Sequence, residues 1–228
     1  MEIVHLFDTN NYENISSFEE QGSEILALDF SPDSKLLATG NKDETVIILD
    51  VGTLQIVHSF PGEEGFGPPK YRVMFLPDGD TLVGGGNNGC LKVWDVLSGE
   101  NIDASIRCSG RNRINDMAVS SDGKFLAIGW NDGGILIRDT STWKIIDNFS
   151  NDALTPEPTK GIVFLPGGSI LVGNIQDNLM IWDVETFKKL GKIKMDMEKI
   201  VAFPDGKHVA LFYKDTVRIL DVEELITK

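Results

Sequence analysis

Three arginines lie within a seven-residue stretch of a strongly acidic chain, and a tryptophan follows a short distance downstream. The arginines are Arg107, Arg111 and Arg113, and the tryptophan is Trp130. A guanidinium group can hold a carboxylate or a phosphate through two parallel hydrogen bonds, and Trp and Arg contribute much of the energy at protein interfaces. With Asp132 and Phe66, these residues are our candidates for contact with an acidic or phosphorylated segment of another protein.

Motifs that would indicate catalysis or a bound cofactor are absent from the sequence. The glycines of Gly84–Gly89 fit a dinucleotide-binding pattern, but that pattern needs a following helix, and a predicted strand at Leu91–Trp94 follows instead. We interpret this segment as a hairpin turn. The histidines His5, His58 and His208 lie in separate predicted strands without metal-ligand spacing. We therefore expect no catalytic residue, no cofactor and no metal site.

The cysteine content and the charge limit the functional classes. Cys90 and Cys108 are too few for a framework of several disulfides, so we expect reduced thiols, with Cys90 in the core and Cys108, next to Arg107, either inert or reactive. The net charge of -14 repels nucleic-acid phosphates and anionic membranes over long range. We expect no nucleic-acid partner and no membrane insertion, and a cytoplasmic location with the nucleus as the alternative.

The chain repeats one plan five times. Each repeat has an apolar run, a turn rich in Pro, Asp and Gly, a second apolar run, a polar turn, and a third run that ends in Asp. The first turns are Ser31–Ser34, Leu76–Gly79, Ser120–Gly123, Leu165–Gly168 and Phe203–Gly206, and the closing aspartates are Asp50, Asp95, Asp139, Asp183 and Asp221. The intervals of 38 to 45 residues between these aspartates match the length of a four-stranded blade.

The apolar runs have the features of short strands. Val46–Leu49 and Ile56–Phe60, for example, are rich in β-branched residues and are bounded by turn formers. A weaker fourth strand follows each closing Asp, often after a large residue such as Leu54, Trp143 or Phe187. We expect that large residue to cover the blade beneath its turn. No segment shows a sustained helical period, so an all-β protein with almost no helix is predicted.

The chain resembles the WD-repeat family over essentially its whole length. The resemblance rests on Trp94-Asp95 and Trp182-Asp183 at the ends of third strands, and on the phrase LDFSPDSKLLATGNKDETVIILD from Leu28 to Asp50. It implies a β-propeller with each blade's first strand nearest the axis. The repeats are degenerate, since Gly-His is missing and Leu49, Arg138 and Leu220 replace the usual Trp. No repeat keeps the family's buried tetrad, of which Thr39 and Asp43 remain in the first and Asp132 in the third.

The repeats define a single propeller domain over residues 1–228. Its parts are an N-terminal half blade at 1–22 and repeats at 23–66, 67–111, 112–156, 157–196 and 197–228. Residues 12–18 could supply the strand missing from the last blade, but 3–8 would then duplicate a strand already present. We therefore expect an arc of a larger, seven-bladed propeller. The alternatives are a small closed ring with a spare edge strand, and a ring completed by a partner.

The resemblance also implies where partners bind. Loops joining the fourth strand to the next first strand, and the second to the third, share the rim that relatives use most. These loops are 61–70, 104–113, 150–159, 41–44, 85–89 and 130–133. We expect a non-enzymatic scaffold for protein binding; a propeller enzyme or small-ligand sensor using the central channel is the alternative. The competing interpretation of the candidate residues is that the arginines are solvated or pair with nearby aspartates, and that Trp130 packs on its own loop.

Overall fold

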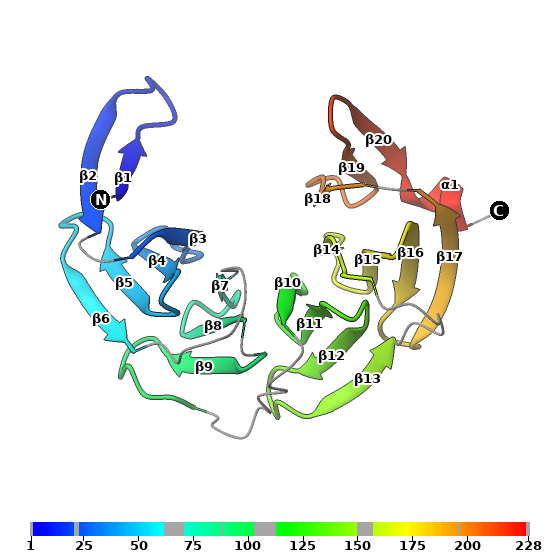
Figure 1. Ribbon diagram of the computed structural model, residues 1–228, viewed down its shortest axis with the longest axis horizontal. Coiled ribbons are helices and arrows are strands. Elements are labelled where there is room, and N and C mark those ends of the chain that lie inside the picture. Colours follow the sequence, from blue (N-terminus) through cyan, green and yellow to red (C-terminus); the bar gives the residue numbers. More distant parts are fainter. Residues whose placement is uncertain are drawn as a thin grey trace. The chain divides into compact units, whose positions relative to one another are not determined.

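The computed structural model describes residues 2–20, 23–61, 71–87, 89–102, 113–149, 157–195 and 197–226. Within them the chain forms twenty β-strands and one short helix, and every strand pairing is antiparallel. The chain divides into two compact units, Met1–Gly110 and Arg111–Lys228. The prediction of an all-β fold is confirmed, and each sheet is one propeller blade or part of one (Figure 1).

The first unit contains a hairpin and two blades. The hairpin is β1 (Glu2–Phe7) with β2 (Asn14–Glu20). The first blade is β3 (Ile25–Phe30), β4 (Leu36–Asn41), β5 (Val46–Asp50) and β6 (Ile56–Phe60). The second is β7 (Tyr71–Phe75), β8 (Thr81–Gly86) and β9 (Leu91–Asp95), beyond which an isolated bridge joins Trp94 to Asn101.

The second unit contains two four-stranded blades, one three-stranded blade and the helix. The first blade is β10 (Ile114–Val119), β11 (Phe125–Trp130), β12 (Ile135–Asp139) and β13 (Ile145–Phe149). The second is β14 (Ile162–Phe164), β15 (Ile170–Ile175), β16 (Asn178–Asp183) and β17 (Lys188–Lys194). The third is β18 (Lys199–Ala202), β19 (His208–Phe212) and β20 (Val217–Asp221), followed by α1 (Val222–Ile226).

Each closing aspartate organises the turn that follows it. The Asp50 carboxylate accepts hydrogen bonds from the Thr53 backbone N (2.8 Å) and the Thr53 hydroxyl (2.8 Å). These bonds favour the charged form, so the pKa of Asp50 is lowered, and the pKa values of the other closing aspartates at the same turn, Asp95, Asp139 and Asp183, are lowered for the same reason. Four residues after these aspartates, and after Asp8, the backbone is left-handed, at Tyr12, Leu54, Gly99, Trp143 and Phe187.

The large residues at this left-handed position have different environments. Trp143 is buried, as predicted, whereas the Phe187 side chain is 37% exposed. The prediction that such a side chain covers its blade is therefore right for Trp143 and wrong for Phe187. The short turn fixes the backbone at both positions, but the ring is buried only where neighbouring side chains leave a space for it.

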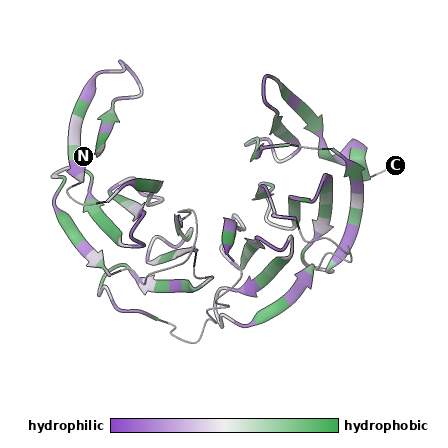
Figure 2. Cartoon of the chain, viewed as in Figure 1, coloured by the Kyte–Doolittle hydropathy of each residue, from purple (hydrophilic) through white to green (hydrophobic). Residues whose placement is uncertain are grey.

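The core lies between neighbouring sheets within each unit. Hydrophobic residues are concentrated in the strands, while the turns are mainly hydrophilic (Figure 2). At the outer part of this core, a Phe at the end of one blade's fourth strand stacks on the Trp of the next blade's third strand. The ring centroids lie 4.9 Å apart for Phe60 and Trp94, and 5.0 Å apart for Phe149 and Trp182. This contact repeats once in each unit and holds consecutive blades together.

The strands at the two chain ends are arranged as the sequence predicts. Val4 and Leu6 of β1 pack against Leu37 and Leu49 of the first blade. β1 and β2 form a sheet of their own, and β18–β20 form a three-stranded sheet. The helix α1 replaces a fourth strand after β20 and contacts β17 of the preceding blade. How the ring closes stays a prediction.

Two local expectations have different outcomes. The first repeat lacks the family's buried tetrad, as predicted: Thr39 is buried with no hydrogen-bond partner for its hydroxyl, and Asp43 bonds to Thr45 in its own turn instead. Cys90 is buried as expected, but it is disulfide-bonded, so the expectation of a reduced thiol is wrong for this residue. Counting cysteines excluded several disulfides, but it cannot exclude a single one. Cys108 lies outside the described residues.

Candidate functional site

The structure places Arg113, Trp130 and Asp132 together at one end of a single blade. Trp130 is the last residue of β11 and pairs with Ile114 of β10, and the backbone N of Asn131 donates to the carbonyl oxygen of Arg113 (2.9 Å). Asp132 is exposed in the following turn, where its carboxylate accepts from the backbone N of Gly134 (3.2 Å). The three residues therefore share the edge formed by β10, β11 and β12.

The backbone around Trp130 is held from both sides. The Trp130 N donates to the Gly134 carbonyl (2.9 Å), and the Trp130 carbonyl accepts from the N of Thr159 (3.1 Å). Thr159 is buried and lies against Gly129, where an added Cβ would be 2.7 Å from the Thr159 side chain. Glycine at 129 thus allows the loop before β14 to close on β11. This contact fixes the backbone that carries the indole ring.

The side chains at this edge are accessible. Both Arg113 and Trp130 are half-buried. Among the described residues, no ion pair is formed by the Arg113 guanidinium. The pairing of Arg113 with a nearby aspartate, one of the competing interpretations, is therefore not seen in that part of the chain. Arg107, Arg111 and Phe66 lie outside the described residues.

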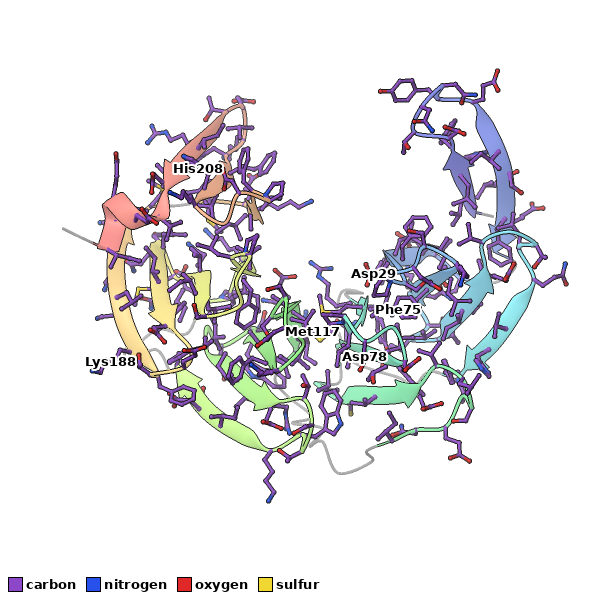
Figure 3. All side chains as sticks on the ribbon, turned by 180° about the vertical axis from the view of Figure 1, so that it is seen from behind. Asp29, Phe75, Asp78, Met117, Lys188 and His208 are labelled. Atoms are coloured by element: carbon purple, nitrogen blue, oxygen red, sulfur yellow. The ribbon has the colours of Figure 1, made fainter. Side chains whose placement is uncertain are left out.

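A second cationic surface lies in the same unit and was not identified from the sequence. The outer strand β17 carries Lys188, Lys189, Lys192 and Lys194, and Lys188 is seen at its outer end (Figure 3). Lys189 and Lys192 line a cleft of about 450 Å³ between β13 and β16–β17. Across the strands they pair with Trp182 and Met180, which line the same cleft together with Phe149 and the acidic Asp147.

The lysine cleft has a signal in the sequence. Four lysines in the seven residues KKLGKIK stand out in a chain with an excess of acidic residues. Simple alternation along a strand would place Lys189 and Lys192 on opposite faces. Both line the cleft because the register of β16 and β17 shifts between Ile181 and Trp182, so the sequence shows the cluster of lysines but not the face that these two share. The apolar side chains at the base of the cleft could not have been detected from the sequence, because Phe149 comes from the preceding blade. Ammonium groups beside apolar side chains suit an acidic segment that also carries an apolar residue.

The three histidines have separate environments. His5 lies 3.1 Å from the Asn14 amide nitrogen, His58 stacks on Phe60, and the His208 Nδ1 lies 2.6 Å from the Asp205 carboxylate. No group of metal-ligating side chains occurs in the described residues. No helix in those residues is long and apolar enough to cross a membrane.

Comparisons with known proteins match successive parts of the chain. A model described as the anaphase-promoting complex subunit 4 WD40 domain matches residues 3–66, and one described as the WD domain, G-beta repeat matches residues 55–95. A guanine nucleotide-binding protein subunit beta from Oryza sativa subsp. japonica is 25% identical over 81% of this chain and 52% of its own length.

Further relatives have a similar degree of identity. The U3 small nucleolar RNA-associated protein 15 homolog of Xenopus laevis is 28% identical over 72% of this chain and 32% of its own length. The WD repeat-containing protein SL1-17 of Schistosoma mansoni is 24% identical over 73% of this chain and 53% of its own length. The chain thus spans about half, or less, of the length of these curated relatives.

Proposed function

Because the chain belongs to the WD-repeat family, we propose that it is a non-enzymatic scaffold that binds segments of other proteins, as a subunit or domain of a larger complex. The loops of one propeller rim make the contact. Loops held by a rigid scaffold are suited to recognition, because they are exposed while their positions are fixed. Repeats of this family in subunits of named complexes support the proposal.

The observation that carries this proposal is the closeness of Arg113 and Trp130 at one blade end. β10 and β11 bring them together, and Thr159 fixes the backbone beside them. An aromatic ring with a guanidinium group that forms no internal ion pair in the described chain is the usual composition of an interface hot spot. The partner segment is acidic or phosphorylated, since Arg113 can bind a carboxylate or phosphate in a bidentate manner. The lysine cleft of the same unit suits the same class of partner.

A nucleic-acid partner and the location of the protein need separate treatment. The negative net charge disfavours nucleic acid in general, but the Xenopus relative is named for association with a small nucleolar RNA. The exclusion of nucleic acid therefore has no support from the comparisons. We retain a protein segment as the ligand. That relative's name favours the nucleus, which was the alternative to the cytoplasmic location.

The blades belong to a larger propeller in this proposal. The outward face of the β1–β2 hairpin exposes Ile3, Phe7 and Ile15, and the last sheet exposes Val217 and Ile219. Apolar faces of this kind in a blade are normally covered by the next blade. We propose that further blades, a partner or a second copy cover them, and that residues 1–228 with the five repeats and half blade form one domain.

The test is a binding experiment on purified protein with a labelled acidic phosphopeptide, in which a phosphoserine is flanked by glutamates. Trp130→Ala and Arg113→Glu should each weaken binding by about 2 kcal/mol or more. Lys144→Glu, at the opposite end of the same blade, changes the charge equally and should leave binding unchanged. The melting temperature of each variant is measured in parallel.

Three outcomes would contradict the proposal. Equal affinity of wild type and both variants would move the binding surface elsewhere. An equal loss in Lys144→Glu would show that net charge alone attracts the peptide. A large fall in the melting temperature of Trp130→Ala, with normal binding by Arg113→Glu, would mean that Trp130 has a packing role.

A further inference from the structure

A groove of about 370 Å³ lies between the two blades of the first unit, at the end opposite to the turns that join second and third strands. It is bounded by the turns at Ser31–Asp33 and Asp78–Asp80 and by the turn that follows β9. Its apolar lining includes Leu36, Val57 and Leu97. The groove belongs to neither of the surfaces described above, because those lie in the second unit.

Leu97 is an unusual residue for its position. Two residues after the closing aspartate, the three other blades in which a turn follows it carry Gly52, Ser141 and Glu185, whereas this blade carries a leucine that is 89% exposed. The turn does not depend on the leucine side chain. The Asp95 carboxylate accepts from the N and the hydroxyl of Ser98 (2.7 and 2.8 Å), which holds the turn as in the other blades. The leucine therefore has no role in the local fold.

The equivalent place in the second unit is closed by a hydrogen bond. There the backbone N of Gly167 donates to the hydroxyl of Ser121 (3.2 Å), which joins the first turns of consecutive blades. In the first unit, Pro32 stands in place of Ser121 and offers no hydroxyl, and Asp78 stands in place of Gly167. The two changes together leave the turns unbridged and place a carboxylate at the edge of the groove.

The groove is acidic. Asp33, Asp78 and Asp80 line it. Among the described residues, the Lys35 ammonium lies 3.1 Å from Asp33, and no ion pair is formed by Asp78 or Asp80. The Asp78 carboxylate is oriented by the backbone N atoms of Asp80 and Thr81 (both 3.0 Å). The chain as a whole carries a net charge of -14. Its long-range field therefore has the same sign as the groove and attracts cations toward it.

We propose that this groove binds a basic segment of a partner protein. An aliphatic or aromatic side chain of the segment packs between Val57 and Leu97, and flanking Lys or Arg side chains pair with Asp78 and Asp80. The apolar contact supplies most of the affinity, because it removes Leu97 from water. The charge pairs supply the association rate and the preference for basic sequences.

Fluorescence anisotropy with synthetic peptides tests this proposal on the full chain. The probe is a labelled peptide with two leucines flanked on each side by two lysines. Its matched controls replace the leucines by serines, or the lysines by glutamates. Wild-type protein should bind the leucine–lysine peptide, and both control peptides should bind at least about tenfold more weakly.

Two variants localise the binding to the groove. Leu97→Ser and Asp80→Lys should each weaken the probe about tenfold or more. Both variants should fold normally, because the side chains are exposed and another blade carries serine at the position of Leu97. The matched controls are Ile145→Ser, an exposed apolar residue of the second unit, and Asp215→Lys, an exposed carboxylate there. Neither control should change the affinity.

The proposal is overturned if the two groove variants bind the probe as wild type does, or if Asp215→Lys weakens it as much as Asp80→Lys. It is also overturned if Leu97→Ser changes only the self-association of the protein in sedimentation velocity. That result would make a second copy of this chain the occupant. None of these outcomes involves Trp130 or Arg113, so the proposed function is judged separately.

Discussion

The carboxylate of Asp29 in β3 accepts a hydrogen bond from the backbone N of Phe75 in β7, at 2.7 Å, and so links the first strands of two consecutive blades (Figure 3). The second unit contains a similar link, in which the Asp116 carboxylate accepts from the backbone N of Ile162 at 3.0 Å. Both links connect residues that are 46 positions apart. Burial raises the pKa of Asp29, while the bond from Phe75 acts in the opposite direction.

Substitutions at Asp29 should separate the hydrogen bond from the charge. Asp29→Ala leaves the N–H of Phe75 without its acceptor and should lower the free energy of unfolding by about 1–3 kcal/mol. Asp29→Asn keeps an acceptor and removes a partly buried charge, so at pH 7 it should be at least as stable as wild type. Because the folded-state pKa is raised, the wild type loses stability as pH rises through that pKa. The stability advantage of Asp29→Asn over the wild type should therefore disappear below pH 3.8, the ordinary pKa of an aspartate.

Urea unfolding of the three proteins at several pH values measures these differences. A destabilised Asp29→Asn at pH 7 would show that the carboxylate charge itself stabilises the link.

Acid should lower the free energy of unfolding, because it protonates carboxylates that accept hydrogen bonds in the first turns of the blades. The Asp205 carboxylate accepts from the backbone N atoms of Lys207 (2.9 Å) and His208 (3.0 Å), and the former bond is the main cause that lowers the pKa of Asp205 to about 2. A lowered folded-state pKa gives stability that is present above the unfolded value and lost as pH falls through the folded value. The free energy of unfolding should fall between pH 3.8 and about 2.

Asp205→Asn should reduce the slope of stability against pH in this window, as measured by denaturant unfolding. Asp215→Asn, which alters an exposed carboxylate outside these turns, serves as the control and should keep the wild-type slope. An unchanged slope in Asp205→Asn would show that this turn contributes nothing to acid sensitivity.

The stacked rings between blades should be coupled in stability. Phe149→Leu should lower the free energy of unfolding by about 1–2 kcal/mol, because it removes a ring that stacks on Trp182. A double-mutant cycle with Trp182→Leu should give a coupling energy of about 0.5–1.5 kcal/mol. The same cycle on Phe60 and Trp94 in the first unit should give a similar value. Additive losses in both cycles would mean that the rings contribute only buried area.

The exposed apolar residues of the last sheet should promote association of the isolated chain. Val217 and Ile219 are 55% and 59% exposed. The double variant Val217→Thr with Ile219→Thr should shift the protein toward monomer in sedimentation velocity, while its melting temperature stays near that of wild type. Ile56→Thr, which alters an exposed apolar residue of the first unit outside the groove, is the control. A wild-type chain that is monomeric at high concentration would contradict the prediction.

The sequence was sufficient to predict most of the strands, because the turn chemistry is local. In place of the fourth strand predicted after Asp95, the described residues form only the isolated bridge between Trp94 and Asn101. Residues 3–8 were predicted as a strand and β1 spans Glu2–Phe7, and the fourth strand predicted after Asp183 corresponds to β17 at Lys188–Lys194. Proline, glycine and the closing aspartate each act within a few residues of their own position. The repeated left-handed residue four positions after the aspartate shows how closely one hairpin resembles the next.

Contacts between blades could not be predicted in the same way. The link from Asp29 to Phe75 depends on how two sheets are aligned, and no short-range pattern encodes that alignment. The same holds for the groove beside Leu97, which depends on Pro32 in one blade and Asp78 in another. At the candidate site, β10 pairs Ile114 with Trp130 and so brings Arg113 near that residue, but the binding role of both residues stays a prediction. The prediction for Arg107, Arg111 and Phe66 stays untested.

In the described residues every strand is hydrogen-bonded only to strands that are its immediate neighbours in the sequence. A tandem duplication of about 44 residues can therefore insert a complete blade without disturbing the pairing inside any other. Selection can then act on the exposed turns of the copies one at a time. A leucine at position 97, where the other copies have Gly52, Ser141, Glu185 and Glu223, is a difference of the kind that such a history produces.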